Sequence, residues 1–352
     1  IQDRLGRVVE DVESLRVPRP GQVLTLSIDR RLQYLAYRAL KTAVLENKAS
    51  AGAAVIVDVH SGEILAMVNQ PAGNPNNRTE LHGELLRNRT ITDVYEPGST
   101  IKPFTVALGL ESGKWTPSTL VNTMPMQIGR YTVRDTHNYS TIDLTHIISK
   151  SSNVGVTKIA LSMPAERLWQ LYRNLGIGTV TGIGLIGEQA GVLHPFSKWA
   201  EIGHANHSFG YGFSLPILQL AQAYGVLAAD GMRRPLTLLK REQTLGPADE
   251  RRVLSASSVR QVRAMMEEVV TKEGTGFKAS VPGYRVAGKT GTARKIIGGH
   301  YTARYFALFA GMAPASAPRL VMAIIIDEPK GGAYYGGTVA APIARDVLKD
   351  LL

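Results

Sequence analysis

The spacing of apolar residues predicts a helix and then a strand pair near the start of the chain. Apolar residues recur at helical spacing over 29–47, at positions Leu32, Leu35, Ala36, Ala39, Leu40 and Ala43. Asp29 precedes them and is placed to cap the N-terminus of this helix. Two apolar runs joined by His-Ser-Gly then predict a β-hairpin over 51–68. The stretch 69–80, rich in Asn, Pro and Gly, is expected to form a loop.

The pattern changes twice along the rest of the chain. From about residue 99 to residue 270 most segments have helical periodicity, interrupted by Gly-rich breaks. Three strand-like segments follow at 284–293, 304–315 and 319–329, and the chain closes with an amphipathic helix at 340–352. The loops between the three segments are short, so they should be antiparallel neighbours, because parallel strands need long crossovers.

These elements define the expected fold class, which is α+β. A central antiparallel sheet of about five strands would draw strands from both ends of the chain, with helices on its faces and a large helical subdomain. We expect two regions: residues 1–20, a linker or the tail of a preceding module, and residues 21–352, one domain. The chain opens on Ile1 and shows neither a signal peptide nor a transmembrane run, so we interpret it as a fragment or a processed product.

Composition narrows the kinds of chemistry that are open to the chain. The 352 residues contain no cysteine, which excludes disulfides, thiolate nucleophiles and cysteine-zinc sites. The net charge is +11, which favours anionic partners. The basic residues are scattered without a long run, so nucleic acid is not an expected partner. Neither a metal nor a cofactor is expected.

A serine and a lysine stand three residues apart in "YEPGSTIKPF", residues 95–104. If a helix starts after Pro97-Gly98, Ser99 and Lys102 share one face and the lysine amine can reach the serine hydroxyl. The alternatives are a helix-capping serine and a phosphate ligand, although no Walker motif surrounds the pair. Pro103 disfavours helical backbone at Lys102, and we expect this turn to hold Lys102 in one pose.

Two more short motifs follow, and each is weak alone. "KSSNVGVTKIAL" from Lys150 places Ser151 and Asn153 before a helical pattern, where a capping role is the simpler interpretation. "AGKTGTA" at 287–293 lies in a strand candidate, where Gly291 would let a ligand chain approach the strand edge. Three side chains of this strand would then project toward a bound carboxylate: Lys289, Thr290 and Thr292. An exposed hairpin edge is the alternative.

Together the motifs S-x-x-K, S-x-N and K-T-G, in this order, are those of penicillin-binding proteins and serine β-lactamases. The chain resembles the transpeptidase domain of class B penicillin-binding proteins, particularly the septal members from Gram-negative bacteria. The stretches that carry the resemblance begin at residue 21 and span nearly the whole chain: 21–33, 87–104, 150–161, 208–224, 287–295 and 324–342. The resemblance implies that residues 1–20 end an N-terminal pedestal module.

The resemblance also implies a role for each motif residue. Ser99 matches the nucleophile that attacks the penultimate D-alanine of a stem peptide, and Lys102 matches its base. Ser151 matches a proton relay to the leaving D-alanine, and Asn153 a ligand of the substrate amide.

The K-T-G strand completes this set. Lys289 matches a cation that shapes the field around Ser151 and the substrate carboxylate. Thr290 and Thr292, flanking Gly291, match the residues that bind this carboxylate. The backbone N–H groups of Ser99 and Thr292 match the oxyanion hole. Which residue takes the proton during acylation stays open.

The partners implied are D-Ala-D-Ala stem peptides, β-lactam antibiotics and division-complex proteins that include a glycosyltransferase. The location implied is the inner membrane, through an N-terminal anchor absent from this chain, with the domain in the periplasm. The class A β-lactamase stretch E-x-x-L-N, which primes water, is not found, and 166–176 has a different arrangement. Slow deacylation is therefore expected. A non-catalytic β-lactam sensor and a D,D-carboxypeptidase are the alternatives.

Three other signals carry less weight. "GIGLIG" at 182–187 matches G-x-G-x-x-G, but no strand precedes it, so a loop is expected. His204 and His207 are three residues apart without a third ligand, which favours a surface or core pair over a metal site. "YYGGTVAAP" at 334–342 would either shape the acyl pocket or pack the last helix.

Overall fold

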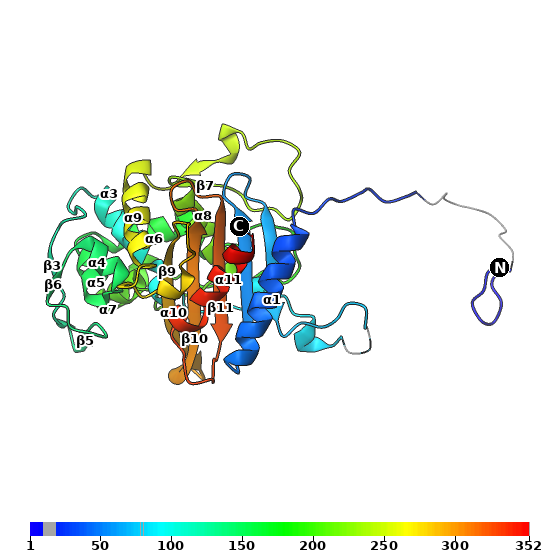
Figure 1. The fold of residues 1–352 in the computed structure, drawn as a ribbon, viewed down its shortest axis with the longest axis horizontal. Coiled ribbons are helices and arrows are strands. Elements are labelled where there is room, and N and C mark those ends of the chain that lie inside the picture. Colours follow the sequence, from blue (N-terminus) through cyan, green and yellow to red (C-terminus); the bar gives the residue numbers. More distant parts are fainter. Residues whose placement is uncertain (10–18, 78, 80, 352) are drawn as a thin grey trace.

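A large antiparallel sheet spans the domain (Figure 1). The computed structural model describes residues 1–9, 19–77, 79 and 81–351. In this part of the chain the sheet has five strands in the order β2-β1-β11-β10-β9. The strands are β1 (Ala51–Asp58), β2 (Ile64–Gln70), β9 (Ala287–Ile297), β10 (His300–Ala313) and β11 (Leu320–Asp327).

Helices cover both faces of the sheet, and more helices pack beyond its β9 edge. The α-helices are α1 (Arg30–Glu46), α2 (Arg89–Thr92), α3 (Lys102–Glu111), α4 (Leu144–Ser149), α5 (Asn153–Leu161), α6 (Ala165–Leu175), α7 (Glu201–Ser208), α8 (Ile217–Ala228), α9 (Ala256–Glu268), α10 (Gly336–Val339) and α11 (Ala341–Leu351). Short 3₁₀ helices are η2 (Gly83–Leu85), η3 (Gly98–Ile101), η4 (Phe196–Lys198), η5 (Pro247–Asp249) and η6 (Phe277–Ala279).

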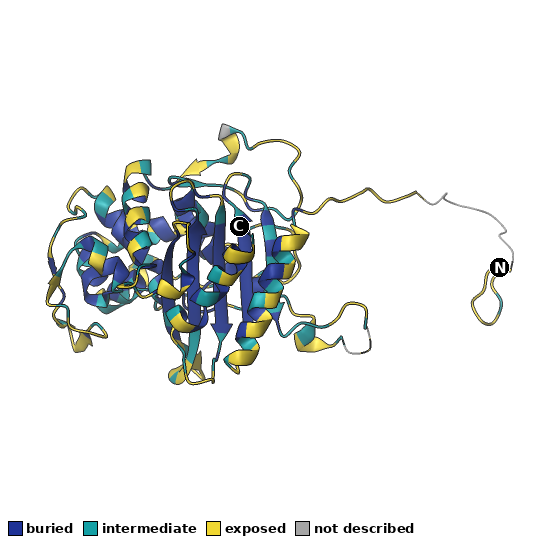
Figure 2. Ribbon diagram, viewed as in Figure 1, coloured by how far each residue is buried: buried dark blue, intermediate teal, exposed yellow. Residues whose placement is uncertain are grey.

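Strand β1 shows why the sheet lies between two layers. Its side chains alternate between two separate cores, because successive residues of a strand point to opposite faces. Val55 and Val57 pack with α3, α5 and α8, whereas Ala54 and Ile56 pack with α1 and α11. Both faces are therefore buried, which explains the unbroken apolar run of β1 (Figure 2).

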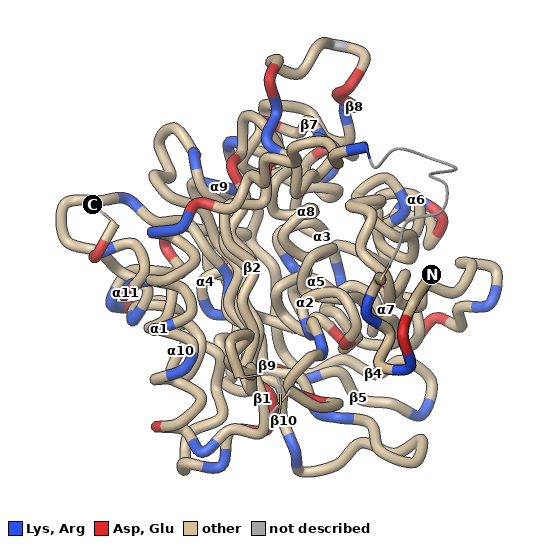
Figure 3. The backbone as a smooth tube through the Cα atoms, turned by 90° about the vertical axis from the view of Figure 1, so that its right-hand side faces the viewer, with Lys and Arg blue, Asp and Glu red and all other residues tan. Residues whose placement is uncertain are grey.

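The sheet and the two terminal helices confirm the expected α+β class. Helix α1 begins after Asp29, whose side chain accepts a hydrogen bond from the Leu32 N–H as an N-cap. The hairpin β1–β2 also forms as expected. Basic residues are spread along the chain among acidic ones (Figure 3).

Some elements differ from the sequence expectation. Strands β9 and β10 continue to a tight turn at Gly298–Gly299, where both glycines have positive φ, so the hairpin includes 294–303, which the apolar pattern left out. Short strand pairs interrupt the helical middle: β3 (Val121–Asn122) with β6 (Thr141–Ile142), β4 (Met126–Ile128) with β5 (Tyr131–Val133), and β7 (Met232–Arg233) with β8 (Arg251–Arg252). Strands of two or three residues are too short to produce a periodic pattern.

The expected boundary at residue 20 stays a prediction. The linker assigned to 1–20 falls partly outside the described residues, which omit 10–18, and the loop expected at 69–80 lacks 78 and 80. None of the helices in the described ranges is long and apolar enough to cross a membrane.

Candidate active site

Ser99 lies in the 3₁₀ turn η3, directly before α3. Gly98 enters this turn with φ +52°, a conformation that glycine adopts readily, and its N–H donates to the Gly210 carbonyl at 3.0 Å. Ser99 itself is half-buried. Its N–H is one of the first in the turn, and such groups have no carbonyl partner within a helix. The sequence therefore builds a turn that presents both the hydroxyl and a free N–H.

Lys102 is completely buried and its amine is held by three acceptors. Nζ donates to the Ser151 carbonyl at 2.6 Å, to Ser151 Oγ at 3.1 Å and to Asn153 Oδ1 at 2.7 Å. The backbone of Lys102 is helical, with φ −56° and ψ −37°, although Pro103 follows. Pro103 is tolerated because it lies in the first turn of α3, where its missing N–H costs no hydrogen bond.

The i, i+3 spacing does not join Ser99 to Lys102 as the sequence suggested. In the described structure, no hydrogen bond links the Lys102 amine to the Ser99 hydroxyl, because the amine donates instead to Ser151 and Asn153. Hydrogen bonds between catalytic groups are often long in the absence of substrate and tighten when it binds. The spacing brings both residues to adjoining turns, and a direct contact between Ser99 and Lys102 stays a prediction.

Ser151 bridges the two buried lysines. Its Oγ accepts from Lys102 Nζ at 3.1 Å and from Lys289 Nζ at 3.0 Å. Its backbone has φ +63°, unusual for a residue other than glycine, in the sharp break between α4 and α5. Strained backbone of this kind often occurs at functional sites.

Asp135 anchors the segment that carries Ser151 and Asn153. Its carboxylate accepts from the N–H groups of Asn153 at 2.5 Å and Val154 at 2.9 Å, and from Ser152 Oγ at 2.5 Å. Ser152 in turn caps α5 through the Gly155 N–H. The capping role that the sequence offered as an alternative therefore belongs to Ser152, which leaves its neighbours free to face the lysines.

Burial shifts the protonation of both lysines in the same direction. Desolvation lowers the pKa of Lys102 to about 7, and the negative charge of Asp135 partly opposes this shift. The pKa of Lys289 is lowered well below its ordinary value, by burial first and then by the positive charge of Lys102. An amine with a pKa near 7 is substantially neutral at physiological pH, as a general base requires.

Strand β9 divides its K-T-G side chains between two faces. Lys289 pairs with Ala310, and the next residue, Thr290, pairs with Phe309, so their side chains point to opposite faces. Lys289 reaches Ser151, whereas Thr290 Oγ1 donates to Thr275 Oγ1 at 2.9 Å. The long Lys289 side chain also returns toward Thr290, because Nζ donates to the Thr290 carbonyl at 3.0 Å. That Lys289, Thr290 and Thr292 all project toward one ligand stays a prediction.

Gly291 is required by a neighbour inside the protein. A Cβ at this position would lie 2.8 Å from Thr100 Cγ2 and 3.1 Å from the Pro97 carbonyl oxygen. The missing side chain therefore lets β9 pack closely against the Ser99 turn. The ligand approach that the sequence suggested for Gly291 stays a prediction beside this intramolecular contact.

The segment at 334–342 fixes the other side of the same strand. The Gly336 N–H donates to Thr292 Oγ1 at 3.1 Å, and a Cβ at Gly336 would lie 2.3 Å from the Gly291 carbonyl oxygen. Helix α10, which starts at Gly336, leads directly into α11. The stretch therefore packs against β9 and positions the last helix, whereas its role in shaping an acyl pocket stays a prediction.

A cleft of about 530 Å³ opens beside Asn153. Its walls combine aromatic rings with two guanidinium groups, those of Arg134 and Arg294. The aromatic residues are Tyr131, Phe209, Tyr211 and Tyr301. Such a lining fits an extended peptide that carries negative charge.

Sequence reasoning missed three polar residues around the site. Asp135 holds the Ser152–Asn153 turn, and Thr275 holds Thr290. Glu96 is buried three residues before Ser99, where its carboxylate accepts from the Gly212 N–H at 2.7 Å and the Tyr301 hydroxyl at 3.0 Å. Of the three, only Glu96 could have been found from the sequence, because it lies in the same short stretch as the S-x-x-K motif. Asp135 and Thr275 lie far along the chain from the residues that they support.

The signals that the sequence set aside form no site in the described structure. His204 and His207 are buried, and His207 stacks against Trp199 with ring centres 3.8 Å apart. No group of His, Asp and Glu able to hold a metal occurs among the described residues. The stretch 182–187 lies in a loop, as expected.

Comparison with known proteins identifies the family. The family model "Penicillin binding protein transpeptidase domain" matches residues 52–349. The peptidoglycan D,D-transpeptidase FtsI of Escherichia coli K12 is 45% identical over 352 residues, which is 100% of this chain and 59% of that protein. The probable peptidoglycan D,D-transpeptidase PenA of Neisseria gonorrhoeae is 43% identical over 351 residues, which is 99% of this chain and 60% of that protein.

Solved structures agree with this match. The apo transpeptidase domain of penicillin-binding protein 3 from Burkholderia pseudomallei aligns with a TM-score of 0.86 and 42% identity, and covers 95% of this chain and 97% of that chain. The chain thus spans about three-fifths of the length of FtsI and nearly all of a solved transpeptidase domain. On these grounds, the chain belongs to the penicillin-binding protein transpeptidase family.

Proposed function

We propose that this chain is the catalytic domain of a peptidoglycan D,D-transpeptidase that cross-links stem peptides. One observation carries the proposal most strongly: Ser151 Oγ accepts hydrogen bonds from two buried lysine amines, one of which belongs to Lys102 in the turn after Ser99. Acyl transfer needs a nucleophile, a base with a pKa near neutrality and a proton donor for the leaving amine. Ser99, Lys102 and Ser151 supply these three parts.

In the acylation step, Ser99 Oγ attacks the carbonyl carbon of the penultimate D-alanine. Neutral Lys102 takes the hydroxyl proton, and the bond from the carbonyl carbon to the terminal D-alanine nitrogen breaks. Ser151 passes a proton to this nitrogen, and the Lys102 ammonium restores the Ser151 proton through their hydrogen bond. The products are a Ser99 ester and free D-alanine.

The remaining residues bind the substrate and stabilise charge. The N–H groups of Ser99 and Thr292 form the oxyanion hole. This is consistent with β9 lying at an edge of the sheet, where alternate N–H groups face away from the neighbouring strand. A donor in such a position typically lowers the barrier by about 3 to 4 kcal/mol.

Thr290 and Thr292 hold the substrate carboxylate, and Lys289 lies beside Thr290. The negative charge of the bound carboxylate opposes the lowering of the Lys289 pKa and so favours its charged form. Asn153 binds the substrate amide and also fixes the Lys102 amine through its Oδ1 at 2.7 Å. The charged, aromatic cleft beside Asn153 accommodates the rest of the stem peptide.

Deacylation distinguishes a transpeptidase from its relatives. The stretch 166–176 forms most of α6, where Glu166 is exposed, and the sequence has no E-x-x-L-N to prime water. An amine of a second stem peptide therefore attacks the Ser99 ester, forms the cross-link and returns the proton to Ser99. β-Lactams acylate Ser99 and stay attached because water reacts slowly.

We also propose a cellular setting, which rests on the resemblance of the sequence to septal class B penicillin-binding proteins. It comprises septal wall synthesis, a periplasmic domain anchored to the inner membrane by a preceding segment, and a division complex that includes a glycosyltransferase.

The decisive experiment offers the protein a D-Ala-D-Ala donor peptide together with an amine acceptor. We expect the cross-linked product to exceed the hydrolysed product, with both abolished in Ser99→Ala. Hydrolysis alone would show a carboxypeptidase, and acylation by penicillin without any peptide turnover would favour a sensor.

A further inference from the structure

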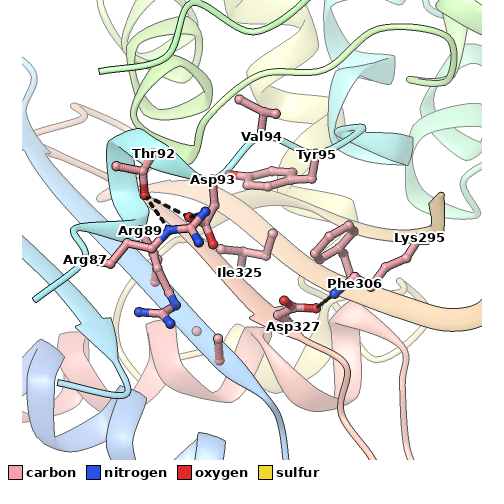
Figure 4. Close-up of a pocket in the computed structure, with 13 residues that line it drawn as sticks. Arg87, Arg89, Thr92, Asp93, Val94, Tyr95, Lys295, Phe306, Ile325 and Asp327 are labelled. Carbon is pink, nitrogen blue, oxygen red and sulfur yellow. Dashed lines mark hydrogen bonds and ion pairs between the residues drawn. The ribbon is translucent and has the colours of Figure 1, made fainter. Parts of the chain in front are cut away.

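A second cavity, of about 270 Å³, lies at one end of the central sheet (Figure 4). Its walls come from the start of β1, from the segment 87–95, and from the ends of β9, β10 and β11. None of the residues proposed for catalysis lines it. The cavity is therefore separate from the cleft beside Asn153.

The strand register explains why this space is open. Ala51 pairs with Asp327 and Ala53 pairs with Ile325, so all four side chains point to the same face of the sheet. The two alanines are too small to fill the space above β1. The hollow is thus encoded by small residues at alternate positions of one strand.

Charged groups stand on opposite sides of the cavity. Figure 4 shows Arg87 and Arg89 on one side and Lys295 with Asp327 on the other. Lys295 Nζ lies 2.7 Å from Asp327 Oδ1, and Arg87 is paired with Asp93 at 2.7 Å. A ligand that spans the cavity would meet the guanidinium groups of Arg87 and Arg89 at one end, and at the other the Asp327 carboxylate in its ion pair with Lys295.

Arg89 is a buried cation of the cavity wall, and among the described residues its guanidinium donates to Glu84 alone, to the backbone carbonyl at 2.8 Å and to the carboxylate. The Arg89 side chain is only 7% exposed, whereas the side chain of Glu84, whose carboxylate lies 2.5 Å away, is 68% exposed. An ion pair with a solvent-exposed partner contributes little, because water and salt screen it. A ligand carboxylate inside the cavity would offer this buried guanidinium a better partner.

Tyr95 gives an independent indication of a ligand. Its side chain is 3% exposed, and its hydroxyl is buried without a hydrogen-bond partner among the described residues. Buried polar atoms are nearly always paired, so each exception needs an explanation. Tyr95 lines the cavity, and its hydroxyl is the kind of donor that a carboxylate accepts from.

We propose that this cavity binds a small apolar α-amino acid as its zwitterion. The carboxylate lies between Arg89 and the Tyr95 hydroxyl, and the ammonium lies beside Asp327. The side chain rests against Ala53 and Ile325. The size agrees, because pockets for drug-sized ligands begin at about 300 Å³ and a cavity of about 270 Å³ suits a smaller molecule.

The cavity walls are connected to both sides of the active site. Tyr95 precedes Ser99 by four residues, and Lys295 follows Thr292 by three on β9. The Tyr95 and Phe306 rings lie 5.5 Å apart, and Lys295 Nζ lies 4.9 Å from the Phe306 ring centre. D-Alanine, which the proposed reaction releases, is one of the small apolar amino acids that this cavity would bind. Only this choice of D-alanine as a ligand rests on the proposed function.

Calorimetric titration tests the binding on Ser99→Ala protein, so that it does not depend on the catalytic proposal. The probes are D-alanine, L-alanine and L-valine, with propionate and ethylamine as analogues that carry one charge each. We expect a Kd of about 1 mM or tighter for at least one amino acid. Both single-charge analogues should bind at least about tenfold more weakly.

Tyr95→Phe is the diagnostic variant. Removal of an unpartnered hydroxyl should leave the melting temperature unchanged or raise it, while amino acid affinity falls about tenfold. Tyr172→Phe is the matched control, because the Tyr172 hydroxyl donates to the His207 carbonyl at 2.6 Å. This control should lower the melting temperature and leave the affinity unchanged.

Several outcomes would overturn the proposal. These are the absence of saturable binding by every amino acid probe, equal affinity in the Tyr95→Phe variant, and equal binding of the single-charge analogues. A further titration uses wild-type protein acylated by a β-lactam. Loss of binding in this form would place the amino acid in the catalytic cleft and not in the cavity.

Discussion

Replacement of Asp135 by asparagine should make acylation faster at mildly acidic pH. Asp135 is the negative charge that opposes the lowering of the Lys102 pKa. Its Oδ1 accepts the Asn153 and Val154 N–H groups, a role that an asparagine oxygen can keep. The variant therefore removes the charge while it retains most of the geometry.

The expected shift follows from Coulomb's law. At an effective dielectric constant of about 20, the loss of one unit charge from the same hydrogen-bond network is expected to change the protonation free energy of the amine by roughly 1 to 2 kcal/mol, or about one pKa unit. The pKa of Lys102, about 7 in the wild type, would fall to about 6. At about pH 6 the neutral fraction would then rise from about a tenth to about a half, which gives roughly fivefold faster acylation.

The assay is the rate of acylation by a chromogenic β-lactam, measured from about pH 5 to pH 9. The rate should rise with pH to a plateau, because neutral Lys102 is the active form, and the midpoint should move down by about one unit in Asp135→Asn. Ser152→Ala is the control, since it removes a 2.5 Å hydrogen bond to the same carboxylate but keeps the charge. An unmoved or raised midpoint in Asp135→Asn would refute the assignment of Lys102 as the base.

Other substitutions test the close packing and the buried polar groups. Gly291→Ala should slow acylation by about 10- to 100-fold, because the new Cβ would lie 2.8 Å from Thr100 Cγ2. The double variant with Thr100→Ser lacks this methyl group and should recover part of the rate in the same assay. No recovery would contradict this contact. Tyr224→Phe should lower the free energy of unfolding in urea by about 1 kcal/mol, since its hydroxyl donates to the Thr100 carbonyl at 2.7 Å; an unchanged midpoint would count against it. Burial lowers the pKa of His207 from 6.5 to about 4. As the pH falls, His207 therefore becomes protonated in the unfolded chain at a higher pH than in the folded protein. The stability should be full above about pH 6.5 and fall by about 3 kcal/mol as the pH drops toward 4, and His207→Phe should remove this dependence in pH-resolved denaturation; an equal slope in both proteins would contradict it.

Local patterns predicted most of the fold. The helix at 30–46, the hairpin after it and the strands near the C-terminus each have an apolar period or a cap that can be read over a few residues. The short strand pairs of the middle region have no such signal. The end of β9 was missed because its residues are exposed there and lack the apolar alternation of a half-buried strand.

The candidate site could be predicted as a set of residues but not as a network. The ordered motifs predicted that Ser99, Lys102, Ser151 and Lys289 meet in one site. In the structure, Lys102 and Lys289 each lie within hydrogen-bonding distance of Ser151. Asp135 was missed because its support of α5 is a tertiary contact across 18 residues, without local periodicity. Lys289 and Thr290 start on opposite faces of β9 because neighbouring residues of a strand alternate, which the motif alone does not show.

The central claim is that Ser99 is the acylated nucleophile, and peptide mapping after exposure to penicillin tests it most directly. The account predicts one penicilloyl group, carried by the peptide that contains Ser99, stable while excess drug is removed and absent in Ser99→Ala. An adduct on another residue, an adduct that persists in Ser99→Ala, or a rapid return to the unmodified mass would contradict it.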